Sequence, residues 1–295
     1  MEDKIISGSK TARKIYQEIR EKAVGLAARG VVPGLVTILA GDDPASISYV
    51  AAKNKTAREL GFASTQINLD RDTGQQELLQ LIDKYNLDDL VDGILVQLPL
   101  PPQMDESKII GRIDPAKDVD GFHPVNAGKM MLGARCFLPC TPRGILELLV
   151  RNGVETSGAE VVVIGRSNIV GKPVANLMLQ KRYGGNATVT VCHTGTKNLA
   201  AHCRRADILI AAVGMAGFVT ADMVKKGCVV IDVGVNRVGQ TKDGRAVLAG
   251  DVDFAEVVKK AGKITPVPGG VGPMTIAMLM QNTLQSAMAR ADMQK

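Results

Sequence analysis

The chain has 295 residues, a length that suits two domains of ordinary size or a single large one. Apolar residues make up 45% and charged residues 22%, a composition typical of a globular protein and not of a disordered chain. The net charge of +6 indicates either a basic surface with no specific role or a preference for anionic ligands. The 3% aromatic content and the lack of a dense Lys/Arg run argue against nucleic-acid binding.

Strand and helix patterns alternate in the first part of the chain. Apolar residues at helical spacing predict helices at residues 9–28, 45–60 and 73–84. Short apolar runs predict strands at residues 35–39, 65–69 and 93–98. This alternation predicts a parallel sheet with helices on its faces.

A second β-α series follows, and it ends with a long helix. Helices are predicted at residues 143–151, 171–179 and 274–291, and strands at residues 160–164, 187–191, 208–212 and 229–233. The last helix is expected to return to the first domain. The predicted fold is therefore α/β, with a discontinuous N-terminal domain of residues 1–138 plus 274–295, a Rossmann-like domain of residues 139–273, and an active-site cleft between them.

The cysteines and the N-terminal residues indicate the compartment. The five cysteines include no Cys-x-x-Cys pair, and their odd number disfavours disulfides and a structural metal site. Residues 1–10 are polar and lack the apolar core of a signal peptide. The longest apolar stretch, Ile208 to Val219, is too short to span a bilayer. We therefore expect a cytoplasmic protein with reduced thiols and no membrane partner.

A glycine turn follows the predicted strand 160–164. Gly165 permits a sharp turn out of the strand, and Gly171 permits close packing at the start of the next helix, whose free N–H groups suit a pyrophosphate. Ser167 replaces the middle glycine of the usual dinucleotide pattern, so an ordinary structural turn is the alternative.

The charges around this turn favour NADP over NAD. An NAD site carries an acidic residue about 20 residues beyond the first glycine, where it binds the ribose. Residues 161–206 contain no Asp or Glu, and Arg166 lies beside the turn. Thr194 offers a hydroxyl where the adenosine ribose should lie, although the alternative for this loop is a simple turn.

Four polar segments could form a substrate site. Tyr49 and Lys53 are spaced i, i+4 and share a helix face, and Lys53 could act as a general base if burial lowers its pKa. Gln97 ends a predicted strand, where ligands of open α/β sheets bind. The others are a polar loop around Asp120 and a Pro/Gly-rich loop at residues 266–275. Each segment also has a purely structural alternative. Lys53 could be an ordinary surface lysine, Gln97 could belong to a turn that ends the strand, the acids around Asp120 could cap a turn, and the Pro/Gly-rich loop could be a rigid entry to the last helix.

Together these segments resemble the bifunctional methylenetetrahydrofolate dehydrogenase/cyclohydrolase family over nearly the whole chain. The motifs are G-D-D-P-A-S-x-x-Y-V-x-x-K at 41–53, Q-L-P-L-P at 97–101, K-D-V-D-G at 117–121, G-R-S-x-x-V-G-x-P at 165–173 and P-G-G-V-G-P-M-T at 268–275. The resemblance implies an N-terminal folate-binding catalytic domain and an NADP-binding domain, and it implies homodimers that form through the cofactor domain.

The resemblance also implies roles for individual residues. Lys53 resembles the cyclohydrolase lysine, Tyr49 would stack on the aminobenzoate ring, and Gln97 would tune Lys53. Asp120 would hold the pterin amide edge. The loop residues that would line the folate site are Pro268, Gly269 and Gly270. The residues that would bind NADP are Gly165, Arg166, Ser167, Gly171, His193, Thr194 and Val235.

The implied function is NADP-dependent oxidation of 5,10-methylene-tetrahydrofolate and hydrolysis of the methenyl product to 10-formyl-tetrahydrofolate. The first step needs no protein acid or base, because the adjacent nitrogen lone pair assists hydride loss. Histidines are therefore expected to have packing roles, and the basic surface suits NADP and a polyglutamate tail. The alternatives are a shikimate-type NADP dehydrogenase and a non-enzymatic NADP-binding sensor.

Overall fold

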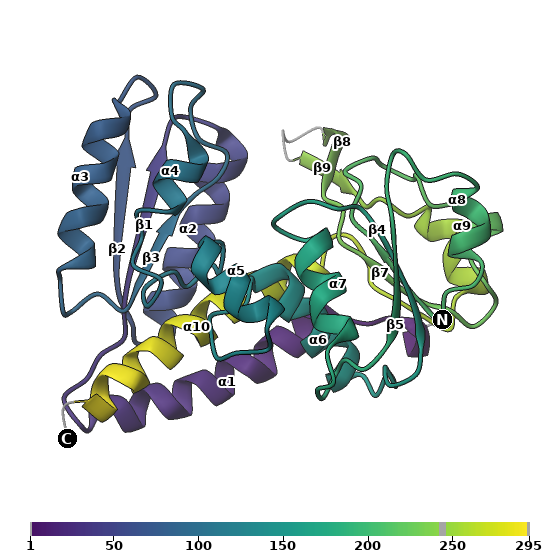
Figure 1. Cartoon of the computed structure of the whole chain (residues 1–295), viewed down its shortest axis with the longest axis horizontal. Coiled ribbons are helices and arrows are strands. Elements are labelled where there is room, and N and C mark those ends of the chain that lie inside the picture. The colour runs from purple at the N-terminus through teal and green to yellow at the C-terminus, as the bar shows by residue number, and fades with distance from the viewer. Residues whose placement is uncertain (1, 242–245, 294–295) are drawn as a thin grey trace. The chain divides into compact units, whose positions relative to one another are not determined.

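The computed structural model describes residues 2–241 and 246–293, which form two compact units (Figure 1). The three-stranded unit contains Lys14–Cys140 and Ile276–Lys295, and the five-stranded unit contains Met1–Arg13 and Thr141–Thr275. Both are α/β units with parallel sheets, which confirms the predicted fold class.

The sheet of the three-stranded unit has the order β2-β1-β3, with all strands parallel. Its strands are β1 (Gly34–Ala40), β2 (Ala63–Leu69) and β3 (Gly93–Val96). Every residue of β1 and β3 is buried, as expected for strands covered on both faces. The three predicted strands are therefore confirmed, although the last ends two residues early.

Helices cover both faces of this sheet. They are α2 (Pro44–Glu59), α3 (Gln75–Asn86), α4 (Glu106–Ile110) and α5 (Pro124–Met131), with parts of α1 (Gly8–Ala27) and α10 (Val271–Met293). On one face, Asn54 of α2 donates a 2.8 Å hydrogen bond to the buried hydroxyl of Thr37. On the other face, α3 packs Leu78 and Ile82 into a core with Ile38. Strand alternation explains this split, because Thr37 and Ile38 point to opposite faces.

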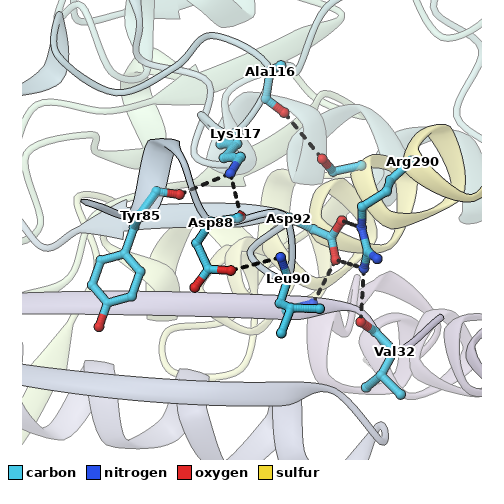
Figure 2. A network of polar contacts seen from close by, with 10 residues as sticks. Val32, Tyr85, Asp88, Leu90, Asp92, Ala116, Lys117 and Arg290 are labelled. Atoms are coloured by element: carbon cyan, nitrogen blue, oxygen red, sulfur yellow. Dashed lines mark hydrogen bonds and ion pairs between the residues drawn. The ribbon is translucent and has the colours of Figure 1, made fainter. Parts of the chain in front are cut away.

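A polar network ties α10 to the amino-terminal end of this sheet (Figure 2). Asp92, just before β3, receives bonds of 2.8 and 2.9 Å from the guanidinium of Arg290 and 2.8 Å from the amide of Gly34. Arg290 also donates to the carbonyl of Val32. Nearby, Lys117 donates to the Tyr85 and Asp88 carbonyls. The network lies at the end of the sheet opposite to Gln97, so it serves to anchor the fold.

The five-stranded unit has a parallel sheet of order β10-β7-β6-β4-β5 and an antiparallel pair, β8-β9. The strands are β4 (Glu160–Ile164), β5 (Thr188–Cys192), β6 (Ile208–Ala211), β7 (Val229–Asp232), β8 (Asn236–Gln240), β9 (Ala246–Ala249) and β10 (Lys263–Ile264). The helices are α6 (Cys140–Arg151), α7 (Gly171–Leu179), α8 (Leu199–Cys203) and α9 (Phe254–Lys260), with short 3-10 turns at Glu2–Lys4 and Ala221–Met223.

The strand order of this sheet changes direction at β4. From β4 the chain moves outward to β5 and then crosses to β6 on the other side of β4. Such a reversal is the topological switch point at which doubly wound sheets bind ligands. The predicted strands and the helix at 171–179 are confirmed, whereas the β8-β9 pair and the helices α8 and α9 were not predicted.

The N-terminal segment belongs to the five-stranded unit, in contrast to the sequence-based division that placed residues 1–138 together. Ile5 pairs with Ile264 as an isolated parallel bridge, and the amide of Ile6 donates a 2.8 Å bond to the Ile264 carbonyl. These residues therefore lie beside the short strand β10 at the edge of the sheet, a pairing that local sequence does not reveal.

Within residues 2–241 and 246–293, no helix is long and apolar enough to cross a membrane. All five cysteines lie in this described part, and none of them forms a disulfide.

Candidate active site

Tyr49, Lys53 and Gln97 form one cluster in the three-stranded unit. The α2 helix begins after Asp43, whose side chain accepts a 2.8 Å bond from the amide of Ser46, and it presents Tyr49 and Lys53 on one face. The Nζ atom of Lys53 lies 4.5 Å from the centroid of the Tyr49 ring. It also donates a 2.9 Å hydrogen bond to Oε1 of Gln97, at the carboxyl end of β3. The fold thus joins two predicted segments.

Lys53 is buried, with 4% of its surface exposed. Loss of hydration lowers the pKa of its ammonium, and the negative charge of Asp120 acts in the opposite direction. The neutral amide of Gln97 satisfies a donor of Lys53 without adding a negative charge. A lysine in this setting releases its proton more readily than a surface lysine, as general-base chemistry requires.

The loop that carries Asp120 is held by a second acid, Asp118, which is 2% exposed. Its carboxylate accepts bonds of 2.8 Å from the amide of His123 and from Nδ2 of Asn126, and 3.2 Å from the amide of Phe122. Burial raises the pKa of Asp118 to about 6, although the hydrogen bonds from Asn126 and His123 lower it.

The acids of this loop have separate roles, which sequence reasoning did not distinguish. Asp114 caps a turn by accepting a 2.8 Å bond from the amide of Ala116, and Asp118 orders the loop from inside. Asp120 is half-buried, and its charge acts on Lys53. His123 is buried and caps α5 through Nδ1, which accepts from the amide of Val125, so its side chain has a capping role here. The burial of Asp118 and its hydrogen bond from Asn126 were not predicted from the sequence.

In the five-stranded unit, a glycine cradle lies at the start of α7. Gly165 has φ of 122°, and a Cβ there would collide with the carbonyl oxygen of Ala212. A Cβ on Gly171 would collide with the Gly165 carbonyl oxygen. Ser167 Oγ accepts from the amides of Val170 and Gly171 at 3.2 and 3.3 Å. The two glycines thus allow the turn after β4 to pack tightly against β6 and against the start of α7, and binding of a dinucleotide pyrophosphate at this helix N-terminus stays a prediction.

The neighbouring loops supply positive charge and hydroxyls. Arg166 is exposed beside the cradle, and Thr194 is exposed in the turn after β5. This turn is closed by Thr196 Oγ1, which accepts a 2.8 Å bond from the amide of His193. The nearest acids in sequence are Glu160, the first residue of β4, and Asp207, which precedes β6, so both lie at the opposite ends of these strands. The carboxyl edge suits a ribose 2′-phosphate, which a carboxylate would repel.

The remaining predicted residues lie apart from the cradle along the chain. Val235 follows β7 and is 61% exposed. Pro268 is exposed and Gly270 is buried in the loop before α10. Gly269 has φ of 100°, and its carbonyl accepts a 3.1 Å bond from the amide of Ser9. Pro268, Gly269 and Gly270 belong to the five-stranded unit, and their contact with folate stays a prediction.

Comparison with known proteins places both units in one family. Residues 6–120 match the model of the tetrahydrofolate dehydrogenase/cyclohydrolase catalytic domain. Residues 139–291 match the NAD(P)-binding domain of the same family.

Relatives resemble the chain over its full length. The bifunctional protein FolD of Syntrophus aciditrophicus is 64% identical over 283 residues, which cover 96% of this chain and 97% of the relative. The crystal structure of the bifunctional enzyme FolD from Campylobacter jejuni has a TM-score of 0.91 and 48% identity, and covers 97% of this chain and 99% of its own. The Trypanosoma brucei enzyme, complexed with NADP cofactor and inhibitor, has a TM-score of 0.91 and 38% identity, with 97% of each chain covered. The chain therefore belongs to the tetrahydrofolate dehydrogenase/cyclohydrolase family.

Proposed function

We propose that this chain is a bifunctional enzyme of one-carbon folate metabolism. It oxidises 5,10-methylene-tetrahydrofolate to 5,10-methenyl-tetrahydrofolate with NADP, and it hydrolyses the methenyl compound to 10-formyl-tetrahydrofolate. The observation that carries this function is the buried Lys53, bonded to Gln97 in a chain that also contains a glycine cradle for a dinucleotide. Family membership favours it over the shikimate-type alternative.

The oxidation places few demands on acid–base groups. The methylene carbon loses a hydride while the lone pair of the adjacent nitrogen delocalises the developing positive charge. Bound NADP supplies the hydride acceptor. The protein binds and orients the reactants, and we assign Gly165, Ser167 and Gly171 to the pyrophosphate.

The specificity for NADP follows from the groups around the cradle. We assign Arg166 and Thr194 to the ribose phosphate, because both are exposed beside the carboxyl ends of β4 and β5. His193 supports the same turn, since its Nδ1 accepts a 3.1 Å bond from the amide of Gly195. Val235, after β7, is assigned to the far half of the cofactor.

The hydrolysis needs proton transfer, and Lys53 provides it. A water oxygen bonds to the methenyl carbon while neutral Lys53 Nζ takes one of its protons. The bond from this carbon to N5 then breaks as the hydroxyl formed from water releases its remaining proton and becomes the formyl oxygen, while Lys53 returns its proton to N5, which yields the 10-formyl compound. Gln97 holds Nζ in place, and the Tyr49 ring stacks on the aminobenzoate group. Asp120 accepts the amide edge of the pterin.

The substrate tail, the assembly and the compartment are further parts of the proposal. The positive net charge of +6 suits a polyglutamylated folate. A homodimer through the five-stranded unit is supported by β5, which is an edge strand, and by Val191, Leu179 and Tyr183, which are 39%, 55% and 85% exposed. Cytoplasmic location is supported by five cysteines without a disulfide, all within the described residues.

Purified protein should be assayed with 5,10-methylene-tetrahydrofolate and either NADP or NAD, and separately with the methenyl compound. We expect NADP-dependent formation of the methenyl product and cofactor-independent loss of its near-ultraviolet absorbance. Binding of NADP without turnover of either folate would overturn the proposal and favour a sensor. Light scattering on the same sample measures the mass, and a monomer would remove the homodimer from the proposal.

A further inference from the structure

The turn after β6 lies at the topological switch point of the five-stranded sheet. Residues 213–215 follow β6 directly, and the preceding Ala212 lies so close to Gly165 that a Cβ on Gly165 would collide with the Ala212 carbonyl oxygen. The cradle and this turn therefore face each other across the boundary between β4 and β6. A dinucleotide that places its pyrophosphate at the cradle extends its two halves to either side of this point.

One buried carboxylate holds this turn in place. Asp251, between β9 and α9, has no exposed surface. Its Oδ2 accepts bonds from the amides of Val213 and Gly214 at 2.6 and 3.0 Å, and its Oδ1 accepts from the amide of Met215 at 2.9 Å. Three successive backbone donors thus converge on one side chain, which fixes the path of the turn.

The same carboxylate also reaches the segment after β7. Oδ1 of Asp251 accepts a 2.9 Å bond from Nδ2 of Asn236, the first residue of β8. A Cβ on Gly234 would collide with the Asp251 carboxylate, so this segment packs directly against it. Val235 lies between these two residues and is 61% exposed. Asp251 therefore links the segments that follow β6 and β7.

A second buried acid fixes the position of Asp251 itself. Oδ1 of Asp232, the last residue of β7, accepts a 2.8 Å bond from the amide of Asp251, and its Oδ2 accepts a 3.0 Å bond from the amide of Val252. We call Asp251 with its bonds to residues 213–215 and Asn236 the Asp251 clamp. Its position is set by the core strand β7 and not by the exposed β8-β9 pair. Such support is expected where the geometry of a binding surface must be maintained.

We propose that Asp251 is a positioning residue for the nicotinamide half of the cofactor, an inference that rests on the proposed function. The adenosine half has its groups after β4 and β5, at Arg166 and Thr194, so the other half falls on the side of β6 and β7. On that side Met215 and Val235 are 57% and 61% exposed, and Asp251 accepts bonds from the backbone amide of Met215 and from the side-chain amide of Asn236, which follows Val235. The residue acts through these segments and touches no reacting atom.

The test compares two ligands on the variant Asp251→Asn. The variant keeps the size of the side chain but removes the charge and places an amide N–H₂ against backbone donors. NADPH contains both halves, whereas 2′,5′-ADP contains only the phosphorylated adenosine half. Calorimetric titration is expected to show binding of NADPH weakened about tenfold or more, and binding of 2′,5′-ADP changed by less than about twofold.

Asp253→Asn is the matched control. Asp253 lies two residues further along and caps α9 by accepting from the amide of Glu256, with no bond to the turn. The Asp253→Asn variant should bind NADPH and 2′,5′-ADP as tightly as the wild type does. In Asp251→Asn the KM for NADP should rise, while hydrolysis of the methenyl compound, which uses Lys53, should remain within about twofold because it does not need the cofactor.

Two outcomes for Asp251→Asn would overturn the inference. One is unchanged binding of NADPH, and the other is an equal loss of affinity for NADPH and 2′,5′-ADP, which would indicate a general structural role. If Asp251→Asn fails to fold, Asn236→Ala removes a single donor and should weaken NADPH while sparing 2′,5′-ADP; no difference between the ligands would again overturn it. Failure of the wild type to bind either ligand would instead contradict the proposed function.

Discussion

The ammonium of Lys53 and the side-chain amide of Gln97 meet at 2.9 Å, although 44 residues separate them in sequence. The orientation of this amide is set by its own Nε2, which donates a 2.6 Å bond to the carbonyl of Leu98. Oε1 is therefore turned toward Lys53. A neutral acceptor stabilises the position of the lysine but contributes no charge that would retain its proton.

Loss of the lysine should separate the two activities. Lys53→Ala is expected to reduce hydrolysis of the methenyl compound by about 10²–10⁴-fold, because no other group takes the proton of the attacking water. Part of the NADP-dependent oxidation should remain, since that step uses no protein base. Lys55→Ala, on the same helix but with a side chain that is 77% exposed, is the control and should keep both activities. Equal loss of both activities in Lys53→Ala would contradict the assignment.

Replacing the neutral partner by an acid should move the pH profile. Burial lowers the pKa of Lys53 below 10.5, so the neutral fraction and the hydrolysis rate rise with pH through that lowered value. In Gln97→Glu a carboxylate beside Nζ favours the charged form and should shift this rise upward by about one pH unit or more. The measurement is kcat/KM for the methenyl compound against pH. A profile that stays in place would show that Lys53 is not the titrating base.

Arg166 should set the preference between cofactors. Arg166→Ala is expected to raise the KM for NADP about tenfold, because a charge-assisted bond to the 2′-phosphate is lost. The KM for NAD should change little, since NAD has no phosphate there. Arg205→Ala is the control, because Arg205 pairs with Glu160 at 3.6 Å near the opposite ends of the strands. Equal effects on NADP and NAD would rule out recognition of the phosphate by Arg166.

The free energy of unfolding should depend on the protonation of Asp118 at acid pH. The pKa of this carboxyl is about 6 in the folded chain, against an ordinary value of 3.8, so the folded state binds the proton more tightly. Its contribution to the free energy of unfolding therefore increases as pH falls from about 6 to about 4.

The variant Asp118→Asn lacks this titration, so the wild type should gain about 2 kcal/mol relative to it between pH 7 and pH 4.5. Urea unfolding of both proteins at the two pH values measures the difference, with the exposed Asp72→Asn as control. A constant difference across this range would show that Asp118 does not titrate there.

The ion pair in Figure 2 should matter more than the surface pairs. Asp92 is 2% exposed, so Arg290→Met leaves a buried carboxylate without its cation and should cost about 3 kcal/mol of stability. Lys55→Met breaks only an exposed 3.9 Å pair with Glu59 and should cost less than about 0.5 kcal/mol. Asp92→Asn combined with Arg290→Met should recover part of the loss in urea unfolding. Equal costs for the two single variants would contradict the expected role of burial.

The sequence by itself determined the features that depend on local pattern. The alternation of strand and helix patterns predicted both parallel sheets. The strands were recognisable as continuous apolar runs, because strands of a parallel sheet are buried on both faces. The i, i+4 spacing placed Tyr49 and Lys53 on one helix face, and the glycines at 165 and 171 indicated the cradle. These are relations between residues near one another in the chain, and backbone geometry alone determines them.

Only the tertiary structure decided the relations between distant residues. Burial of Lys53, its bond to Gln97 and the different roles of Asp118 and Asp120 depend on which elements pack together. The clamp of Asp251 joins residues up to 38 positions apart, and no periodic pattern encodes it. Hydrogen-bond partners and desolvation are properties of the packed core. From sequence alone, polar residues such as Lys53, Asp118 and Asp251 cannot be distinguished from polar residues of solvent-exposed helices and turns.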